Sequence, residues 1–439
     1  MFNPKPIRCA AALAVLLAAL PALAQDAAAT SAPIKILFVG NSYTFGRADP
    51  VMSYNAKNVT DMTDAMWQAN PSGTNAWEPH PWGGVPGIFK AMTVEAGLSY
   101  DVSLSTRNAA TLRGQFLNTA NTGWDLRGNV ASQRWDAVVL QTQSDEPLPV
   151  NKGKNAAPAT FAAYATAFER YIHTGNIGVG TVASGSISYT ENQLYGSSAN
   201  CRLPETGLSG GSCNQTRSVP VNANFNPAAK VYIEQTWARP DMVEAHLITV
   251  PDPNSPNGAP IVDTSSSGGP ATLYYTSAAS TAANLSAMTK DLHDAFYNLA
   301  SSNTNLAGVI PVGDAFQRAV DQGLVLGSGF YKADGTYVEP TDGSINLWWL
   351  DRTHASVYGS YLSALTTFGR ITGLDPRTLG PNETAASDLG IGITAAAMLE
   401  EVAAQQLGFA AAVPEPGSSA LMGAGVVALL GVARRRARR

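Results

Sequence analysis

A serine, an aspartate and a histidine lie where nucleophilic chemistry could use them, although they are far apart in the chain. Ser42 directly follows an apolar run in the segment Ile-Lys-Ile-Leu-Phe-Val-Gly-Asn-Ser, which begins at residue 34. His354 comes three residues after Asp351, in the segment Asp-Arg-Thr-His. A serine becomes a nucleophile when a histidine takes its proton, and a carboxylate can orient that histidine and stabilise its charged form. These residue types predict a catalytic triad of Ser42, His354 and Asp351.

Plainer interpretations of these residues stay open from the sequence alone. Ser42 could bond the backbone in a strand-to-loop turn, because serine is common in such turns. Asp351 or Thr353 could cap the helix expected after His354 by accepting hydrogen bonds from its first amides.

The run at 34–39 predicts the element that positions Ser42. A short apolar run rich in β-branched residues and ended by glycine is typical of a parallel strand buried on both faces. The carboxyl edge of such a sheet is where ligands bind in open α/β folds. Further sheet strands are expected at 100–106, 136–141, 230–236 and 307–311, and 177–182 is an additional strand candidate.

Helical patterns alternate with these strands. Helices are expected at 86–96, 111–117, 158–174, 281–299, 312–322 and 355–371. Strands alternating with helices predict an α/β fold, with a central parallel sheet of five strands covered on both faces.

Two segments are expected to be loop-rich insertions. Residues 47–84 have no clear period, and we expect them to cover the edge where Ser42 lies, with Trp77, His80 and Trp82 contacting substrate. A surface position is the alternative for His80. Residues 184–228 are rich in turn formers and contain Cys201 and Cys213, which we expect to form a disulfide in an oxidising compartment.

Both ends of the chain have the pattern of export segments. Lys5 and Arg8 precede an apolar run and a small-residue cleavage site, so residues 1–24 are predicted to be a secretory signal peptide. At the other end, Val-Pro-Glu-Pro at 413–416 is followed by a short apolar segment at 418–433 and an arginine-rich end. A short transmembrane segment at 418–433, with its arginines on the cytoplasmic side, is expected before processing.

The charge of the body excludes one class of partner. The whole chain has a formal net charge of −5; the signal peptide contributes +2 and the tail from Pro414 contributes +4, so the body carries −11. An acidic body argues against nucleic acid as a partner.

The C-terminal pattern closely resembles the PEP-CTERM sorting signal, which combines a Pro-Glu-Pro motif, an apolar helix and a basic end. The resemblance implies processing by an exosortase-type enzyme in a Gram-negative bacterium that makes exopolysaccharide. It places the protein in the cell envelope or the extracellular matrix. An ordinary C-terminal membrane anchor is the alternative.

The triad residues, with their neighbours, resemble the SGNH (GDSL-like) hydrolase superfamily. The branch concerned has a first block reading Gly-Asn-Ser-x-Thr, as residues 40–44 do here, and Asp351 and His354 match the last block. The resemblance spans about 34–376, a hydrolase-like domain followed by a helical extension at 377–412. It implies a flavodoxin-like three-layer α/β/α fold and the catalytic roles assigned above to Ser42, Asp351 and His354.

The middle blocks depart from the family pattern. The family's oxyanion hole uses the nucleophile's amide, an amide after the second strand and a side-chain amide after the third. By resemblance these donors would be Ser42, Ala109 or Ala110 in place of a glycine, and Gln141 or Gln143 in place of an asparagine. The related branch favours Gln141.

Competing motifs are less specific. Gly-x-Ser-x-Gly around Ser209 lacks the strand and helix that a nucleophile elbow needs, and Gly-x-Gly at 178–180 is not followed by a helix. We expect His173, His246 and His293 to be structural, and no metal site or cofactor is expected.

The sequence therefore predicts an exported serine esterase that hydrolyses acyl esters, with carbohydrate O-acetyl groups on an acylated polysaccharide as the expected substrate. A non-catalytic glycan-binding or matrix protein on the same fold is the alternative, supported by the altered middle blocks.

Overall fold

The computed structural model describes residues 32–47, 49–72, 79–246, 249–251, 260–262, 271–332, 337–341 and 343–410. The predicted signal peptide, Trp77 and the predicted membrane segment at 418–433 lie outside these residues. Within them, no helix combines the length and the apolar character needed to cross a membrane.

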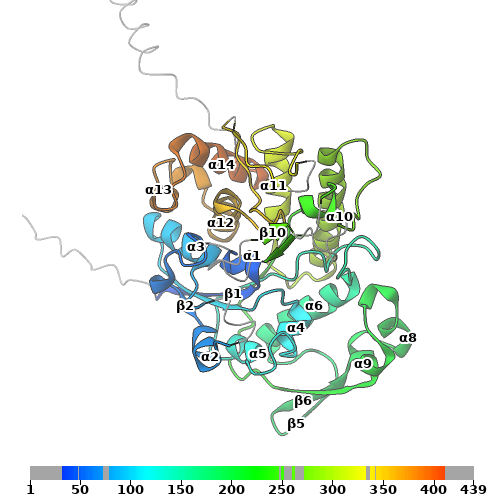
Figure 1. The fold of residues 1–439 in the computed structure, drawn as a ribbon. Coiled ribbons are helices and arrows are strands. Elements are labelled where there is room, and N and C mark those ends of the chain that lie inside the picture. Colours follow the sequence, from blue (N-terminus) through cyan, green and yellow to red (C-terminus); the bar gives the residue numbers. More distant parts are fainter. Residues whose placement is uncertain are drawn as a thin grey trace, which may run out of the picture. The chain divides into compact units, whose positions relative to one another are not determined.

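A six-stranded parallel sheet forms the centre of the fold (Figure 1). Its strands are β1 (Ile34–Gly40), β2 (Thr60–Asp61), β3 (Tyr100–Thr106), β4 (Ala137–Leu140), β8 (Lys230–Glu234) and β11 (Gly308–Ile310). All five predicted sheet strands are present, and the α/β prediction is confirmed. The predicted count of five is wrong by one, because two residues of the 47–84 segment add β2 at an edge, parallel to β3.

The strand order places the end of β1 at a crevice. The order is β11-β8-β4-β1-β3-β2, so β1 lies between β3 and β4. Without the edge strand β2, this is the flavodoxin-like order, in which the connection from β1 to β3 and the connection from β4 to β8 run toward opposite edges of the sheet. Ligands bind outside the carboxyl ends of the strands at such a switch point. Ser42 follows β1 at this point.

Alternate side chains of β1 face two separate cores. Ile36 and Phe38 belong to one core, and Leu37 and Val39 belong to the other, as the two-residue period of a strand requires. The first core is covered by α3 (Gly84–Glu95), α11 (Val312–Asp321), α12 (Val357–Thr372) and α14 (Ile393–Gln406). The second is covered by α4 (Leu112–Phe116) and α6 (Pro158–Thr174). The long helix α10 (Thr281–Ser302) contributes to both.

Helix α6 shows how local sequence sets an element. It begins at Pro158 and ends before Gly175, which has the left-handed conformation common after a helix, and these are the predicted bounds. The aromatic side chains along one side, Phe161, Tyr164, Phe168 and Tyr171, are buried against the sheet.

The 184–228 segment forms a small unit beside the second core. It contains β6 (Ser186–Thr190) and β7 (Thr216–Pro220), which form an antiparallel sheet with β5 (Thr181–Ala183) directly before the segment, and the helices α7 (Glu191–Leu194), α8 (Ser198–Cys201) and α9 (Gly210–Asn214). The disulfide between Cys201 and Cys213 is present, as predicted. The strand candidate at 177–182 overlaps β5, which belongs to this unit and not to the central sheet.

Shorter elements complete the described part. They are α1 (Ser42–Phe45), α2 (Asp64–Ala69), α5 (Leu126–Val130), α13 (Thr384–Asp388), the antiparallel pair β9 (Thr249–Pro251) and β10 (Pro260–Val262), and 3-10 helices at Ala56–Asn58, Pro204–Thr206, Pro240–Met242 and Pro376–Thr378. Buried residues of α13 and α14 join the first core, so the helices after residue 377 share the core of the sheet.

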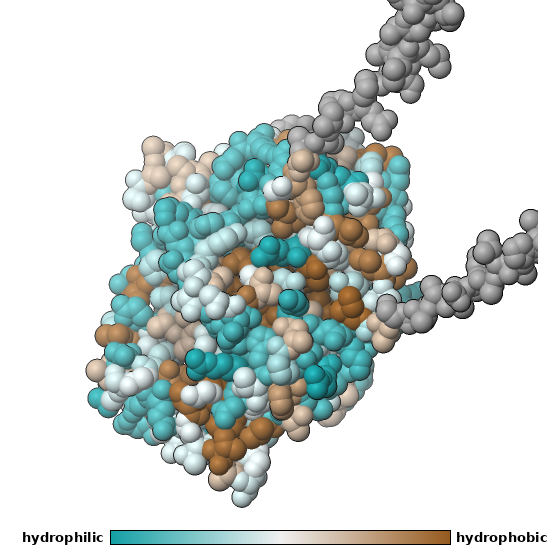
Figure 2. Space-filling view, turned by 180° about the vertical axis from the view of Figure 1, so that it is seen from behind, coloured by the Kyte–Doolittle hydropathy of each residue, from teal (hydrophilic) through white to brown (hydrophobic). Residues whose placement is uncertain are grey.

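Apolar side chains reach the surface in separate places. Seen from behind, hydrophobic patches alternate with hydrophilic ones (Figure 2). The exposed large apolar residues of the described part belong to different elements, for example Val94 in α3, Val182 in β5 and Ile393 in α14.

Candidate active site

The structure brings Ser42, His354 and Asp351 together at the carboxyl end of β1. Ser42 is the first residue of α1, and its Oγ lies 2.7 Å from Nε2 of His354. Nδ1 of the same imidazole lies 2.6 Å from Oδ2 of Asp351. The two contacts form a continuous hydrogen-bonded line from hydroxyl to carboxylate, more than 300 residues apart in the chain.

The carboxylate of Asp351 is held in its ionised form. Its Oδ1 accepts hydrogen bonds from the amides of Thr353 and His354, at 3.0 and 2.9 Å. Burial raises the pKa of Asp351, but the charge of His354 and these hydrogen bonds outweigh burial and lower it to about 2. The carboxylate therefore remains available to orient the imidazole throughout the neutral range.

The helix-cap alternative for Asp351 and Thr353 is wrong. Helix α12 begins at Val357, and its cap is Ser356, whose Oγ accepts a hydrogen bond from the amide of Gly359. Asp351 is thus free of the helix end and is turned toward the imidazole.

The turn that carries His354 is fixed by aromatic side chains. The carbonyl oxygen of Thr353 accepts a hydrogen bond from the Tyr43 hydroxyl at 2.8 Å and another from Trp237 Nε1 at 3.0 Å. The rings of Tyr43 and Trp237 stack with 3.8 Å between their centroids. Because Tyr43 is the residue after Ser42, its side chain connects Ser42 with the turn that carries His354.

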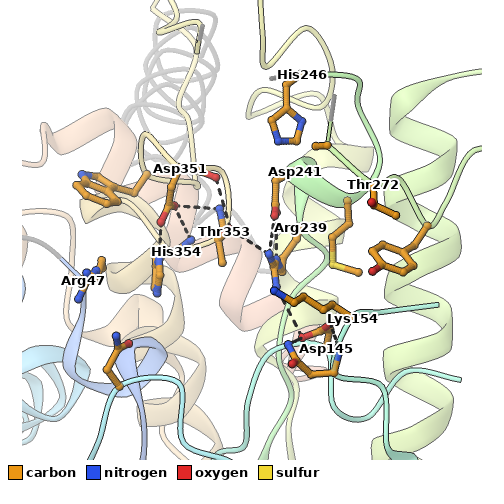
Figure 3. A pocket seen from close by; sticks show the side chains of 16 residues that line it. Arg47, Asp145, Lys154, Arg239, Asp241, His246, Thr272, Asp351, Thr353 and His354 are labelled. Atoms are coloured by element: carbon orange, nitrogen blue, oxygen red, sulfur yellow. Dashed lines mark hydrogen bonds and ion pairs between the residues drawn. The ribbon is translucent and has the colours of Figure 1, made fainter. Parts of the chain in front are cut away.

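Arg239 connects the same turn to the loops after β4 and β8. Its guanidinium binds Asp241 and donates to Thr353 Oγ1 at 3.2 Å (Figure 3). It also donates to Ser144 Oγ at 2.9 Å. Burial alone would lower the pKa of Arg239, but the charge of Asp241 and the hydrogen bonds to it have the larger effect. The pKa is therefore raised above its ordinary value, and the side chain is cationic. Arg239 was not predicted as a site residue, because its position after β8 was the only feature of the sequence that pointed to the site.

Gln141 holds the turn that contains Ser42 in place. Its Oε1 accepts hydrogen bonds from the Asn41 amide at 3.0 Å and from Thr44 Oγ1 at 3.1 Å, and its Nε2 donates to the Thr142 carbonyl. The side chain is 1% exposed. The prediction that Gln141 donates to an oxyanion is therefore wrong, because both ends of its amide are engaged in the turn.

Gln143 also bonds within its own loop. Its Oε1 accepts hydrogen bonds from the amides of Asp145 and Glu146, and its Nε2 donates to Ser144 Oγ at 3.1 Å. A donor role for Gln143 stays a prediction.

The two candidate alanines in the turn after β3 have different backbone environments. Ala109 has a φ of 54°, the left-handed conformation that favours glycine, which is the residue that the family pattern has here. The amide of Ala110 donates to the Arg107 carbonyl at 3.1 Å, so the prediction for Ala110 is wrong. Within the described residues, the amides of Ala109 and Ser42 have no hydrogen-bond partner.

A pocket of about 730 Å³ opens beside His354 (Figure 3). Its lining is largely polar. The lining residues are Arg47, Asn108, Asp145, Lys154, Asn155, Arg239, Asp241, Met242, His246, Ala271, Thr272, Tyr274, Trp349, Asp351, Thr353 and His354.

Most of these lining residues were not identified as site residues from the sequence, among them Asn108, Trp349 and His246. Asn108 precedes Ala109, and its side chain forms no hydrogen bond with another described residue. Trp349 is partly exposed and offers an aromatic ring to the pocket. His246, predicted to be structural, lines the pocket and stacks on Tyr331. Local sequence gave no distinguishing pattern for any of them.

The predicted substrate contacts in the 47–84 segment are wrong where the structure describes them. Trp82 is 0% exposed and stacks between Phe45 and His80. His80 is 7% exposed, and its Nδ1 lies 2.5 Å from Asp61 Oδ2. Neither the substrate-contact nor the surface prediction for His80 holds, because the insertion folds inward and buries both rings. Trp77 lies outside the described residues.

The competing sites occupy structural positions. Ser209 caps α9 by accepting from the Ser212 amide. His173 bonds Glu169 and the Ala229 carbonyl, and His293 bonds Asp314. Among the described residues, no group of three or more histidine, cysteine or acidic side chains is arranged to hold a metal ion.

Comparison with known proteins identifies the C-terminal segment. Residues 412–439 match the family model described as the PEP-CTERM protein-sorting motif. The chain ends in a sorting motif. This confirms the prediction from the Pro-Glu-Pro pattern, and a motif of this kind indicates a secreted, envelope-associated protein. The matched residues lie outside the described part, and no curated protein matches the chain.

Two solved structures show similarity to the fold. One, from Slackia heliotrinireducens, is described as a candidate SGNH hydrolase; the TM-score is 0.34 and the identity 14%, covering 77% of this chain and 99% of that one. The other is a DUF4886 family protein from Bacteroides uniformis, with a TM-score of 0.36 and 12% identity, covering 85% of this chain and 95% of that one. With TM-scores this low, neither likeness carries an argument about the site.

Proposed function

We propose that the protein is a serine esterase in which Ser42 attacks the carbonyl carbon of an acyl ester. The observation that carries this proposal is the line of contacts of 2.7 and 2.6 Å from Ser42 through His354 to Asp351. His354 Nε2 takes the hydroxyl proton as the Ser42 Oγ–carbon bond forms, and then gives it to the leaving alcohol. Asp351 holds the tautomer of His354 and stabilises the imidazolium. A water molecule then attacks the acyl group on Ser42 through the same proton transfers and releases the acid.

The oxyanion would be bound by the amides of Ser42 and Ala109. Both are without partners in the described part, and preorganised amides of this kind stabilise the charge that develops in acyl transfer. We propose the side-chain amide of Asn108 as the third donor, because it lines the pocket with His354, whereas Gln141 is engaged elsewhere. The side-chain donor of the oxyanion hole would then come from the second sequence block, whereas the family pattern has it in the third block.

A carbohydrate ester with a short acyl group is the proposed substrate. The lining of the pocket is dominated by polar side chains, which suits a hydroxylated leaving group better than a long alkyl chain. Trp349 offers an aromatic face beside His354, and such faces suit sugar rings. The sorting motif agrees with a substrate outside the cytoplasm, such as an acylated polysaccharide.

Hydrolysis of p-nitrophenyl acetate by the purified chain tests the reaction. We expect turnover by the wild-type protein, loss of about 10³-fold or more in kcat for Ser42→Ala, and labelling of the wild type alone by a serine-directed phosphonate. Ser209→Ala, which removes a capping serine far from His354 in the chain, serves as the control and should retain activity. Equal inactivity of wild type and Ser42→Ala, with no labelling, would contradict the proposal.

A non-catalytic glycan-binding protein is the second candidate. It is favoured by the loss of the usual third-block donor, since Gln141 is buried in the turn below Ser42. Under this alternative, Ser42→Ala would bind acetylated oligosaccharide as tightly as the wild type while neither protein hydrolyses it.

A further inference from the structure

One charged side chain in the pocket lining, that of Lys154, has no partner of opposite charge among the described residues. The lining contains the acids Asp145, Asp241 and Asp351 and the bases Arg47, Lys154 and Arg239. The acids are all engaged by other groups. Lys154 forms no ion pair or hydrogen bond with another described residue, and it lies at the pocket that His354 lines (Figure 3).

Each acid of the lining is accounted for by specific contacts. Asp351 accepts from His354 and from two amides. Asp241 accepts two hydrogen bonds from Arg239. Asp145 accepts from the amide and the side chain of Asn155, both at 3.0 Å, and lies 3.8 Å from Arg239. None of these carboxylates is thus left to neutralise Lys154.

The loop that carries Lys154 is held in place. Asn155, the next residue, is bound to Asp145 through two hydrogen bonds, and Ala157 donates to the Glu146 carbonyl at 2.9 Å. On the other side, Gly153 approaches Asp145 so closely that an added Cβ would lie 2.8 Å from its Oδ2. The backbone on both sides of Lys154 is therefore fixed against Asp145, and the flexible ammonium is presented from a defined point.

The neighbouring lysine of the same loop has a different environment. Lys152 lies with its Nζ 4.9 Å from the centre of the Tyr275 ring, a cation–π contact, and it is not part of the pocket lining. The loop therefore carries two lysines, of which one contacts an aromatic ring and the other faces the pocket.

We propose that the pocket selects ester substrates that carry a carboxylate, bound by the ammonium group of Lys154. This inference rests on the proposed esterase function and specifies its substrate. Arg47 also lines the pocket, near His354 (Figure 3). The lining holds three acids and three bases and is therefore neutral overall, whereas the body of the protein is acidic, with a net charge of −11 between the two end segments. An anionic sugar such as a uronate, or an acyl group with a free carboxyl, would supply the missing partner.

The test compares three esters that differ in the carboxylate. They are an O-acetylated methyl glucuronoside, the matched O-acetylated methyl glucoside, and the glucoside esterified with succinate. We expect kcat/KM to be about fivefold to tenfold higher for one of the two anionic esters than for the neutral one, as for a single charge-assisted contact. The better anionic ester shows whether the carboxylate belongs to the sugar or to the acyl group.

Variants assign the preference to the lysine. Lys154→Gln should reduce the ratio of kcat/KM for anionic over neutral ester to about one, whereas Lys152→Gln, which removes the same charge two residues away, should keep the ratio. Added salt should lower the ratio for the wild type, because a partly exposed ion pair is screened. Equal hydrolysis of the three esters by the wild type, or a ratio unchanged in Lys154→Gln, would overturn the inference and leave the esterase standing. Failure of the wild type to hydrolyse any ester would instead overturn the esterase.

Discussion

Three aspartates of the described part contact a histidine at hydrogen-bond distance, namely Asp351, Asp61 and Asp314, and the first two pairs can be compared directly. The Asp351–His354 pair contacts Ser42, while the Asp61–His80 pair is buried within the 47–84 segment. The chemistry of the two pairs is the same, and only the position differs. Their comparison therefore tests the proposed catalytic role of Asp351 against a structural one.

Asp351→Asn should therefore lower kcat without a large change in KM. Asparagine can no longer stabilise the imidazolium, and it can favour the wrong tautomer, so we expect a loss of about 10³-fold in kcat. Steady-state kinetics with p-nitrophenyl acetate measure it. Asp61→Asn is the matched control, and we expect it to lower thermal stability while its kcat stays near that of the wild type. A small loss in Asp351→Asn, similar to that in the control, would speak against the triad.

The third oxyanion donor can be assigned by two amide truncations. Asn108→Ala should reduce kcat about 10²-fold with KM nearly unchanged, because an oxyanion donor acts mainly in the transition state. Gln143→Ala should have a smaller effect, since the Gln143 amide bonds Ser144 and the amides of its own loop. The opposite order of the two kcat losses would assign the donor to Gln143.

The residues of the triad were predictable, and several of their neighbours were not. Ser42 and His354 stand next to the ends of regular elements, where the sequence marks a strand end and a helix start. Gln141 was assigned the wrong role because the direction of its amide depends on the turn of Asn41, a tertiary contact between residues one hundred positions apart. Trp349 and Arg239 were missed because nothing local distinguishes a pocket side chain from any other tryptophan or arginine.

At the scale of elements, the junction of β1 and α1 is the most constrained. Gly40 ends β1, and a Cβ added there would lie 2.0 Å from Thr44 Oγ1 and 2.7 Å from Gln141 Oε1. These are the side chains that hold the turn of Ser42 together. The close approach explains why the strand is followed by glycine before the nucleophile.

Gly40→Ala should impair both stability and catalysis. We expect the free energy of unfolding to fall by about 2 kcal/mol, as for overpacking of a tight site, and kcat to fall because α1 must shift. Denaturant unfolding and kinetics on the same sample measure both. Gly392→Ala is the control, because an added Cβ there meets nothing within 4 Å and Gly392 precedes α14, away from the turn. An unchanged kcat in a folded Gly40→Ala protein would show that the turn tolerates the shift.

The bounds of an element were predictable where the sequence contains residues that start or stop it. Residues 158–174 were predicted as they are found, because proline and glycine mark the two ends of α6. The inward fold of the 47–84 segment was not predictable, since it depends on the stacking of Trp82 against Phe45 of α1 and on the pairing of β2 with β3. Such contacts leave no periodic pattern in the segment itself.

At the scale of the whole molecule, the fold buries several carboxyl groups. Burial raises the pKa of Glu234, at the end of β8, to about 8. Burial also raises the pKa of Glu146 and of Glu400 to about 8, although hydrogen bonds oppose it in part. These carboxyls are protonated in the folded state at pH values where the unfolded chain has ionised them.

The free energy of unfolding should therefore fall as pH rises from about 4.5 to about 8. A group with a raised folded-state pKa binds its proton more tightly in the folded protein, so its stabilisation is complete below the unfolded pKa and is lost as pH rises through the folded one. Glu234 is suited to the test because its carboxyl group forms no hydrogen bond or ion pair with another described residue and the residue is 2% exposed. Glu234→Gln keeps the shape of the side chain and removes its titration. We expect the variant to exceed the wild type in free energy of unfolding by about 2 kcal/mol or more at pH 8 and to lose most of that advantage near pH 4.5, as followed by urea unfolding.

The control is Glu205→Gln, at an exposed 3-10 helix, whose plot of unfolding free energy against pH should run parallel to that of the wild type. A Glu234→Gln curve that also runs parallel to the wild type would show that the carboxyl of Glu234 ionises in the folded protein as it does in the unfolded chain.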